Sequence, residues 1–293
     1  GWGLEDNIIE AYRNLVFCYE PGDQIFIFGF SRGAYTARSL AGLIRKAGIL
    51  PRHQVHRVGE AMALYRERGR AMAPDQPHVM ERRADLSPDV ATSQAEVEWR
   101  LAQGKLDQKG EPPILVQIRY LGVLDTVGAL GLPAFMGIVA KLVNNRHAFH
   151  DTDLSHLVLS ARHAVAIDER RTLYPPALWG NLDGPDGLNH GETGPDRPYQ
   201  QLWFPGVHGV VGGSGPVPGL SAYPAGWIAE GARAELARLD FDRPSLQAIA
   251  AAADPVAEAG AMVQKRGWSN LYGALLADRE GPRRAADVAE AAR

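Results

Sequence analysis

Residues 24–38 read QIFIFGFSRGAYTAR, and this stretch decides the fold. Its first half, residues 24–30, is a short apolar run rich in Ile and Phe, which is typical of a strand buried in a parallel sheet. A helical pattern begins directly afterwards and continues to Gly48. The stretch therefore predicts a buried strand, a sharp turn at Ser31 and then a helix.

The turn matches G-x-S-x-G, the nucleophile elbow, through Gly29, Ser31 and Gly33. Such a turn strains the serine backbone and exposes the hydroxyl above the sheet, where a base and a substrate carbonyl can both reach it. The two glycines are expected to remove Cβ atoms that would clash as strand and helix approach. The helix N-terminus favours negative charge, so the Arg32 N–H is a candidate oxyanion donor. A glycine-flanked turn without chemistry is the alternative.

An acid and a base should follow such a serine, each at the end of a strand. Asp125 ends the apolar run of residues 114–125, so it should lie at the same sheet edge as the elbow. A helix N-cap is the alternative role for this aspartate. Asp168 is the alternative acid, although a position at a helix end, paired with Arg170 or Arg171, is the simpler interpretation.

Among nine histidines, His208 has the position expected of a catalytic base. It follows the apolar residues 201–207 and precedes a glycine-rich turn, on which an imidazole can serve both the serine and the leaving group. His190 lies in a polar loop, and His163 lies within a helical pattern. We therefore expect the triad Ser31, Asp125 and His208.

Strands alternate with helices along the chain, which predicts an α/β fold: an α/β-hydrolase-like parallel sheet with flanking helices. We expect a catalytic domain over residues 1–240 and a helical tail over residues 241–293. The other predicted elements are a helix over 5–19, a helical insertion or mobile cap without a strong strand signal over about 51–111, a helix over 154–167, a loop over 180–198, a strand over 199–207, a helix over 224–239 and a helical segment over 268–277.

The composition excludes several classes of protein. The net charge of −3 gives no overall field toward nucleic acid or acidic lipid. No apolar run reaches 18 residues, so no transmembrane helix is expected, and no secretory signal is visible. The single cysteine, Cys18, has apolar neighbours, which predicts a buried thiol in a protein made in a reducing compartment. No metal-ligand cluster is visible, and the chemistry needs no cofactor.

Four blocks in order carry a family resemblance: GFSRGAYTAR, LGVLDTVGALGLP, AIDERRTLYPPALW and QLWFPGVHGVVGG. From residue 1 to about 239, the chain resembles the α/β-hydrolase domain of the bacterial type VI secretion phospholipase effectors (Tle1-like) and their uncharacterised relatives. The resemblance implies Ser31 as nucleophile, Asp125 as acid and His208 as base. It also implies hydrolysis of a carboxylic ester, in some members a phospholipid acyl ester, in a bacterium.

The chain departs from the family pattern at two places. Relatives usually carry Asp two residues after the histidine, where this chain has Val210. Such domains also begin with earlier strands and an Asp-Gly-Thr loop, whereas this chain begins just before the strand of the elbow. We therefore expect a fragment that lacks its N-terminal strands, exposes a sheet edge and lacks the upstream region that would help to form the second oxyanion donor.

These observations predict a serine hydrolase that cleaves a carboxylic ester, with a (phospho)lipid acyl ester as the expected substrate. One alternative is an esterase or thioesterase for a soluble substrate. Another is an inactive remnant or interaction module that retains the fold. By family analogy, secretion machinery and an immunity protein are the expected partners, and the protein would be cytoplasmic as made and delivered to another cell's periplasm.

Overall fold

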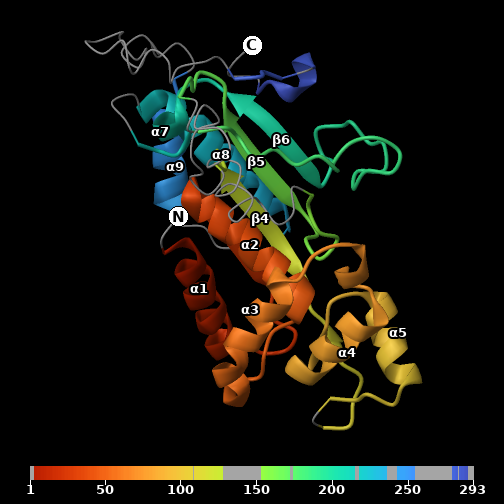
Figure 1. Cartoon of the computed structure of the whole chain (residues 1–293). Helices are drawn as coiled ribbons and strands as arrows, with labels where there is room; N and C mark the ends of the chain where they lie inside the picture. Colours follow the sequence, from red (N-terminus) through yellow and green to blue (C-terminus); the bar gives the residue numbers. More distant parts are fainter. Residues whose placement is uncertain are drawn as a thin grey trace, which may run out of the picture.

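The computed structural model is organised around a parallel sheet with the strand order β1-β4-β5-β6. The strands are β1 (Ile25–Phe30), β4 (Ile118–Leu124), β5 (Ala161–Ala166) and β6 (Tyr199–Phe204) (Figure 1). The structure describes residues 3–107, 109–127, 153–171, 174–214, 218–235, 243–254, 279–282 and 284–289. Within this part of the chain, the sequence prediction of an α/β fold with a parallel sheet is confirmed.

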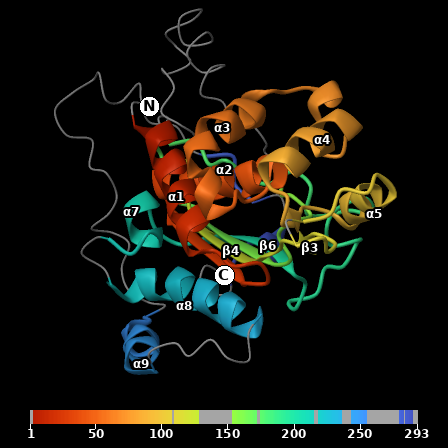
Figure 2. The ribbon, with the colours of Figure 1, turned by 90° about the horizontal axis from the view of Figure 1, so that it is seen from below.

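Helices cover both faces of the sheet, as Figure 2 shows. The first layer contains α1 (Leu4–Cys18), α2 (Arg32–Ala47) and α3 (Val58–Arg66), with α2 packed on β1 and β4. The other face is covered by α8 (Pro218–Glu235), and α9 (Arg243–Ala252) packs against α8. The arrangement is therefore three layers, with the carboxyl ends of all four strands at one edge of the sheet.

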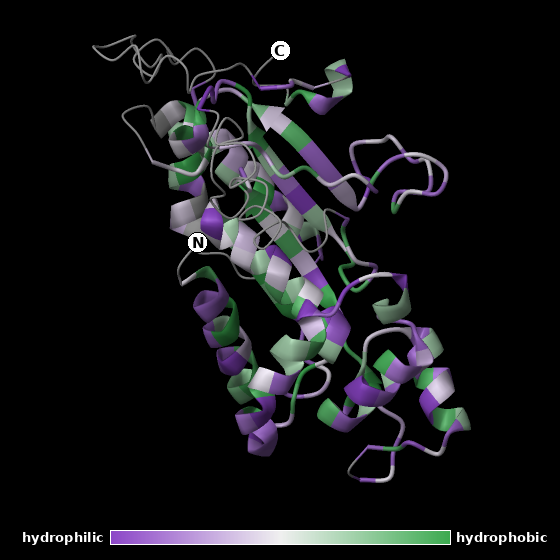
Figure 3. Ribbon diagram, viewed as in Figure 1, coloured by the Kyte–Doolittle hydropathy of each residue, from purple (hydrophilic) through white to green (hydrophobic). Residues whose placement is uncertain are grey.

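The amphipathic helix α1 packs its apolar side against α2 in the first layer. Ile8, Tyr12 and Val16 form its buried stripe, and both hydrophobic and hydrophilic residues are visible on the helix in Figure 3. The Tyr12 hydroxyl donates to the carbonyl of Gly48 at 2.9 Å, just beyond the end of α2. Cys18 lies on the outward side and is exposed, so the prediction of a buried thiol is wrong.

The strand β5 corrects the prediction of a helix over residues 154–167. The run Ala161–Ala166 lies between β4 and β6, where nearly every residue is buried on both faces. A short run buried on both faces has no alternation, so its hydrophobic pattern does not distinguish helix from strand. His163 therefore lies on a central strand and not on a helix.

The predicted insertion over residues 51–111 is mostly helical. It contains η1 (Arg52–Arg57), α3, η2 (Arg70–Met72), α4 (Pro77–Leu86) and α5 (Gln94–Ala102). It also contains β2 (Val90–Ala91), which pairs in parallel with β3 (Ile114–Leu115) and which the sequence did not indicate. The predicted loop over residues 180–198 is confirmed as a series of turns and bends.

The strand β1 lies at one edge of the described sheet, and the Phe28 side chain on it is 51% exposed. At the other edge, the chain returns after η5 (Ala285–Asp287), and the Ala289 N–H donates to the Trp203 carbonyl at 2.9 Å. The predicted helical segment over 268–277 lies outside the described residues.

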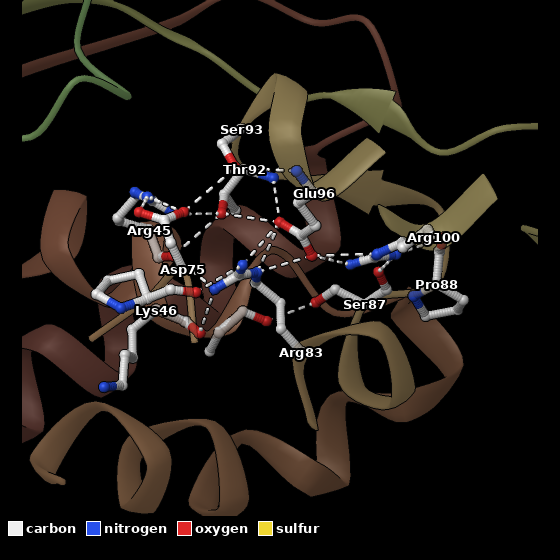
Figure 4. Close-up of polar contacts among 12 residues, drawn as sticks. Arg45, Lys46, Asp75, Arg83, Ser87, Pro88, Thr92, Ser93, Glu96 and Arg100 are labelled. Carbon is white, nitrogen blue, oxygen red and sulfur yellow. Dashed lines mark hydrogen bonds and ion pairs between the residues drawn. The ribbon is translucent and has the colours of Figure 1, made fainter. Parts of the chain in front are cut away.

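A buried ion network fastens the insertion to α2 (Figure 4). The Glu96 carboxylate accepts from Arg83 at 2.9 Å and from Arg100 at 2.6 Å, and all three side chains are at most 1% exposed. Burial alone would raise the pKa of Glu96, but the two guanidinium groups outweigh it and lower that pKa. Arg83 also donates to the carbonyls of Arg45 and Lys46, which lie in the last turn of α2 and lack helical partners. The network therefore holds the insertion against the helix that begins at the elbow.

We predict that Glu96→Gln lowers the free energy of unfolding by about 3–5 kcal/mol, because it leaves two buried arginines without their counter-charge. Glu98→Gln, on the exposed side of the same helix, should change it by less than about 0.5 kcal/mol. Urea unfolding of both variants measures the difference. Equal losses would show that the network adds nothing specific.

Candidate active site

Ser31 occupies the turn between β1 and α2. Its φ of 58° and ψ of −120° place a non-glycine residue in a strained region of the backbone, as the elbow motif predicts. The Ser31 N–H donates to the Leu124 carbonyl at 3.0 Å, so the adjacent strand fixes the turn. The side chain is thereby presented at the edge where β4 also ends.

The two glycines of the motif have different roles. A Cβ atom on Gly29 would lie 2.5 Å from the Gly33 carbonyl oxygen and 2.7 Å from the Ala34 Cα. A Cβ atom on Gly33 meets no described atom within 4 Å, and its φ is not positive. The prediction that both glycines relieve a clash is therefore correct for Gly29 and wrong for Gly33.

His208 approaches Ser31 from β6, the strand at the other side of the sheet from β1. It is the first residue of α7 (His208–Val211), shortly after β6, and its Nε2 lies 2.7 Å from Ser31 Oγ. Its Nδ1 lies 2.7 Å from Oδ2 of Asp125, which directly follows β4. With the imidazole proton on Nδ1, the ring donates to the carboxylate and accepts from the serine hydroxyl. The structure therefore brings the three predicted side chains into one hydrogen-bonded chain.

Asp125 is buried and fully hydrogen-bonded. Its Oδ1 accepts from the Ala166 N–H at 2.9 Å, and the Arg279 guanidinium contacts Oδ1 at 2.7 Å and Oδ2 at 3.0 Å. Burial alone would raise the pKa of Asp125, but the hydrogen bonds from His208 and Arg279 outweigh it and lower the pKa to about 2. The carboxylate therefore stays ionised at neutral pH.

Two aromatic rings and a second carboxylate fix His208. The rings of Phe30 and Tyr174 lie 4.7 Å and 4.9 Å from the imidazole, measured between centroids. The Glu169 carboxylate accepts the His208 backbone N–H at 3.2 Å and pairs with Arg171 at 2.7 Å. Sequence reasoning missed Glu169 and Tyr174, although both lie in the block AIDERRTLYPPALW.

The alternative acid Asp168 does not join this chain of hydrogen bonds. Its Oδ2 accepts the Gly206 N–H at 2.6 Å and so fixes the loop that leads to His208. Of the two arginines predicted as its partners, Arg170 and Arg171, the second makes its ion pair with Glu169.

Val210, where the chain departs from the family pattern, is a buried packing residue. It is 2% exposed, and a Cβ atom on Gly206 would lie 2.7 Å from it, at a φ of +107° that already favours glycine. The carboxylate that contacts the His208 backbone belongs to Glu169, on another segment.

The Arg32 backbone N–H, the candidate oxyanion donor, lies directly after Ser31 in the chain. Arg32 is the first residue of α2, and the first N–H groups of a helix have no partner within the helix. This N–H adjoins the serine and lies at the positive end of the helix dipole. The site can therefore stabilise negative charge next to Ser31.

The His163 side chain, on β5, forms a hydrogen bond with the backbone just after β4. Its Nε2 accepts the Thr126 N–H at 3.2 Å, and its Nδ1 lies 3.0 Å from the Gln201 side-chain oxygen. Only the neutral ring satisfies both contacts, because a protonated Nε2 would oppose the amide N–H. Burial, reinforced by the charge of Arg38, lowers the pKa of His163 to about 3.

Two further properties of the described residues bear on the chemistry. Among the described residues, no group of three or more His, Cys, Asp and Glu side chains could hold a metal ion. None of the helices in the described ranges is both long and apolar enough to cross a membrane.

The strained serine turn beside a parallel sheet defines an α/β-hydrolase-like protein. The chain belongs to the family described as the catalytic domain of Tle1-like phospholipase effectors of the type VI secretion system, whose model matches residues 1–231.

Individual relatives are more distant. Over 171 residues, the chain is 30% identical to the uncharacterized protein YEL023C of Saccharomyces cerevisiae, which corresponds to 58% of this chain and 20% of that protein. The chain thus spans about a fifth of the length of this curated relative.

Two solved structures are also similar. The Tle1 effector bound to the VgrG spike of the type VI secretion system is 21% identical, with a TM-score of 0.32, over 74% of this chain and 32% of that one. An uncharacterized protein from Pseudomonas aeruginosa is 20% identical, with a TM-score of 0.37, over 82% of this chain and 29% of that one.

We predict that Gly29→Ala lowers the free energy of unfolding by about 1–3 kcal/mol, because its methyl group would overlap the Gly33 carbonyl. Gly33→Ala is the matched control and should change it by less than about 1 kcal/mol, since alanine favours the helix. Thermal unfolding measures both. A Gly33→Ala variant as unstable as Gly29→Ala would contradict the elbow geometry.

We also predict an acid-sensitive stability that depends on His163. Its folded pKa of about 3 lies below the ordinary 6.5, so only the unfolded chain gains this proton as the pH falls. The free energy of unfolding should fall by up to about 1.4 kcal/mol per pH unit through this window. The corresponding loss for Asp125 lies lower, between 3.8 and about 2.

Urea unfolding between pH 6.5 and 4.5 therefore isolates the histidine. His163→Gln should flatten the pH dependence there, while His53→Gln, at an exposed position, should leave it unchanged. An unchanged slope in His163→Gln would show that His163 is not held neutral.

Proposed function

We propose that the chain is a serine hydrolase of carboxylic esters, with Ser31 as nucleophile, His208 as base and Asp125 as the acid that orients it. The observation that carries the proposal is the pair of 2.7 Å contacts, Ser31 Oγ to His208 Nε2 and His208 Nδ1 to Asp125 Oδ2. This is the arrangement that activates a serine hydroxyl, whatever the order of its members in the sequence.

The reaction proceeds in two steps. His208 Nε2 takes the hydroxyl proton as Ser31 Oγ attacks the ester carbonyl, and the Arg32 N–H donates to the resulting oxyanion. The imidazolium then gives its proton to the departing alcohol, which leaves an acyl group on Ser31. Water, deprotonated by the same imidazole, releases the acid and restores the serine. Asp125 remains ionised throughout and stabilises the imidazolium.

Family membership supports a phospholipid acyl ester as the substrate. The large hydrophobic side chains that are exposed in the described part of the chain are Phe17, Phe28, Leu101, Leu106 and Ile114. None of them belongs to the residues that form the hydrogen-bonded chain. A soluble ester or thioester is therefore the alternative substrate, and the experiment must distinguish it from a phospholipid.

Two further aspects of the proposal rest on family membership alone. These are delivery to another cell by a type VI secretion machine and inhibition by an immunity protein. The third alternative, an inactive remnant, predicts no convergence of the three side chains, whereas their 2.7 Å contacts support an assembled site.

We predict that a fluorophosphonate probe labels the protein and that Ser31→Ala abolishes the labelling, because only an activated serine reacts with it. Release of fatty acid from phosphatidylethanolamine vesicles, compared with p-nitrophenyl butyrate and a short acyl thioester, then assigns the substrate class. A folded protein that resists the probe would overturn the proposal, and activity on the soluble compounds alone would overturn the phospholipid assignment.

The acid is tested by a matched pair of variants. Asp125→Asn should lower kcat by about 10⁴-fold, because an amide no longer holds the required tautomer of His208. Asp168→Asn retains an oxygen that accepts the Gly206 N–H, so it should stay within about tenfold of wild type. The reverse order of losses would assign the acid to Asp168.

A further inference from the structure

Arg279 lies against the candidate active site, although the family match ends at residue 231. It belongs to the described segment 279–282, which is far from Asp125 in the sequence. Its side chain is only 5% exposed, and the Asp125 side chain is fully buried. A charged side chain so far from water needs a specific partner.

The guanidinium makes four contacts that tie three segments together. Nη1 donates to Asp125 Oδ1 and to the Ala166 carbonyl, both at 2.7 Å. Nη2 donates to Asp125 Oδ2 at 3.0 Å and to the Tyr174 carbonyl at 2.6 Å. The first pair joins the acid to the end of β5, and the second joins it to the segment whose Tyr174 ring contacts His208.

This arrangement constrains the acid through both of its oxygens, one of which His208 also contacts. A planar guanidinium that contacts both carboxylate oxygens fixes the rotation of the carboxylate as well as its position. The remaining donor, the Ala166 N–H, reaches the same Oδ1 that Nη1 contacts. The Oδ2 atom is thereby held at 2.7 Å from His208 Nδ1.

We propose that Arg279 is a positioning residue for the hydrolysis proposed above: it orients the Asp125 carboxylate toward His208, so that the catalytic unit includes the C-terminal segment. This inference rests on the proposed function for its effect on rate, but the contact itself can be tested without activity. It also changes the predicted division of the chain, because residue 279 would belong with the catalytic domain of residues 1–240.

Arg279 also affects the charge balance of the site. Within the described ranges, the polar and charged groups that face Asp125 and His208 are Ser31, His163, Glu169, Arg171, Tyr174 and Arg279. Arg279 places its positive charge within 3.0 Å of the carboxylate oxygen that His208 also contacts, and like charges repel at such distances. Removal of that charge should therefore shift the acidic limb of the pH–rate profile to higher pH.

The activity test compares Arg279→Gln, Arg279→Lys and the control Arg284→Gln, with p-nitrophenyl butyrate between pH 5 and 9. Arg284 lies shortly after Arg279 in the sequence but pairs with Asp183 and Asp287 on the surface. Arg279→Gln should lose about 10- to 100-fold in kcat, as misplacement of a supporting group does, and its acidic limb should move up. Arg279→Lys keeps the positive charge, so the acidic limb of its pH–rate profile should stay at the wild-type pH. Arg284→Gln should match the wild type in both rate and pH profile.

Two results would overturn the positioning role. One is an Arg279→Gln variant with the rate and pH profile of wild type. The other is an equal loss in Arg279→Gln and Arg279→Lys with an unmoved acidic limb, which would indicate a merely structural contact. Thermal unfolding of each variant confirms that the comparison is between folded proteins.

A second measurement is independent of activity. Trypsin should cleave slowly after the buried Arg279 and faster after the exposed Arg284 in the wild-type chain. Asp125→Asn should accelerate cleavage after Arg279 only, because it removes the charged partner. Equal cleavage at both arginines in the wild type would overturn the contact. Protection at Arg279 in a protein that no fluorophosphonate labels would instead overturn the proposed function and leave the contact standing.

Discussion

The parallel pairing of β1 with β4 is the constraint on which the site depends. Phe30 lies opposite Leu124, so the strained serine and the acid leave neighbouring strands at the same level. The hydrogen bond from the Ser31 N–H to the Leu124 carbonyl fixes the turn directly onto the strand that carries Asp125. The pairing of β5 with β6 then fixes the position of the short loop that leads from β6 to His208. A shift of one residue in the register would turn every side chain of a strand to the other face and separate the three groups.

The buried carboxylates of Glu96 and Asp125 are both held by arginines, and the two arrangements differ in one respect. Glu96 lies between Arg83 and Arg100, all of them inaccessible, and its contacts connect the insertion to the last turn of α2. Asp125 has one arginine and one histidine as partners, and the histidine leads to a hydroxyl that a substrate can reach. Burial disfavours the charged form of both acids, and in both the partners outweigh it. The charge of Glu96 is balanced entirely by buried arginines, whereas the hydrogen bonds that start at Asp125 end at the Ser31 hydroxyl.

Much of the site could be predicted because each of its three side chains follows an apolar strand. Ser31 follows β1, Asp125 follows β4, and His208 comes shortly after β6. Local patterns could not indicate β5, because a strand buried on both faces has no alternation. Contacts of Asp125 with Arg279 and of His208 with Glu169 join distant segments, and no periodicity or spacing marks such pairs. The role of Gly33 was overestimated because a motif does not reveal which of its glycines meets another atom.

The central claim is that the hydrogen-bonded chain makes Ser31 a nucleophile that carries the acyl group between the two steps. A rapid-quench reaction with a p-nitrophenyl ester, followed by mass spectrometry of the protein, observes that intermediate directly. The structure predicts a rapid release of about one equivalent of p-nitrophenol per active site, with the acyl group recovered on the peptide that contains Ser31. Turnover without a burst would contradict this claim. So would an acyl group on another residue, or a Ser31→Ala variant that hydrolyses the ester as fast as the wild type.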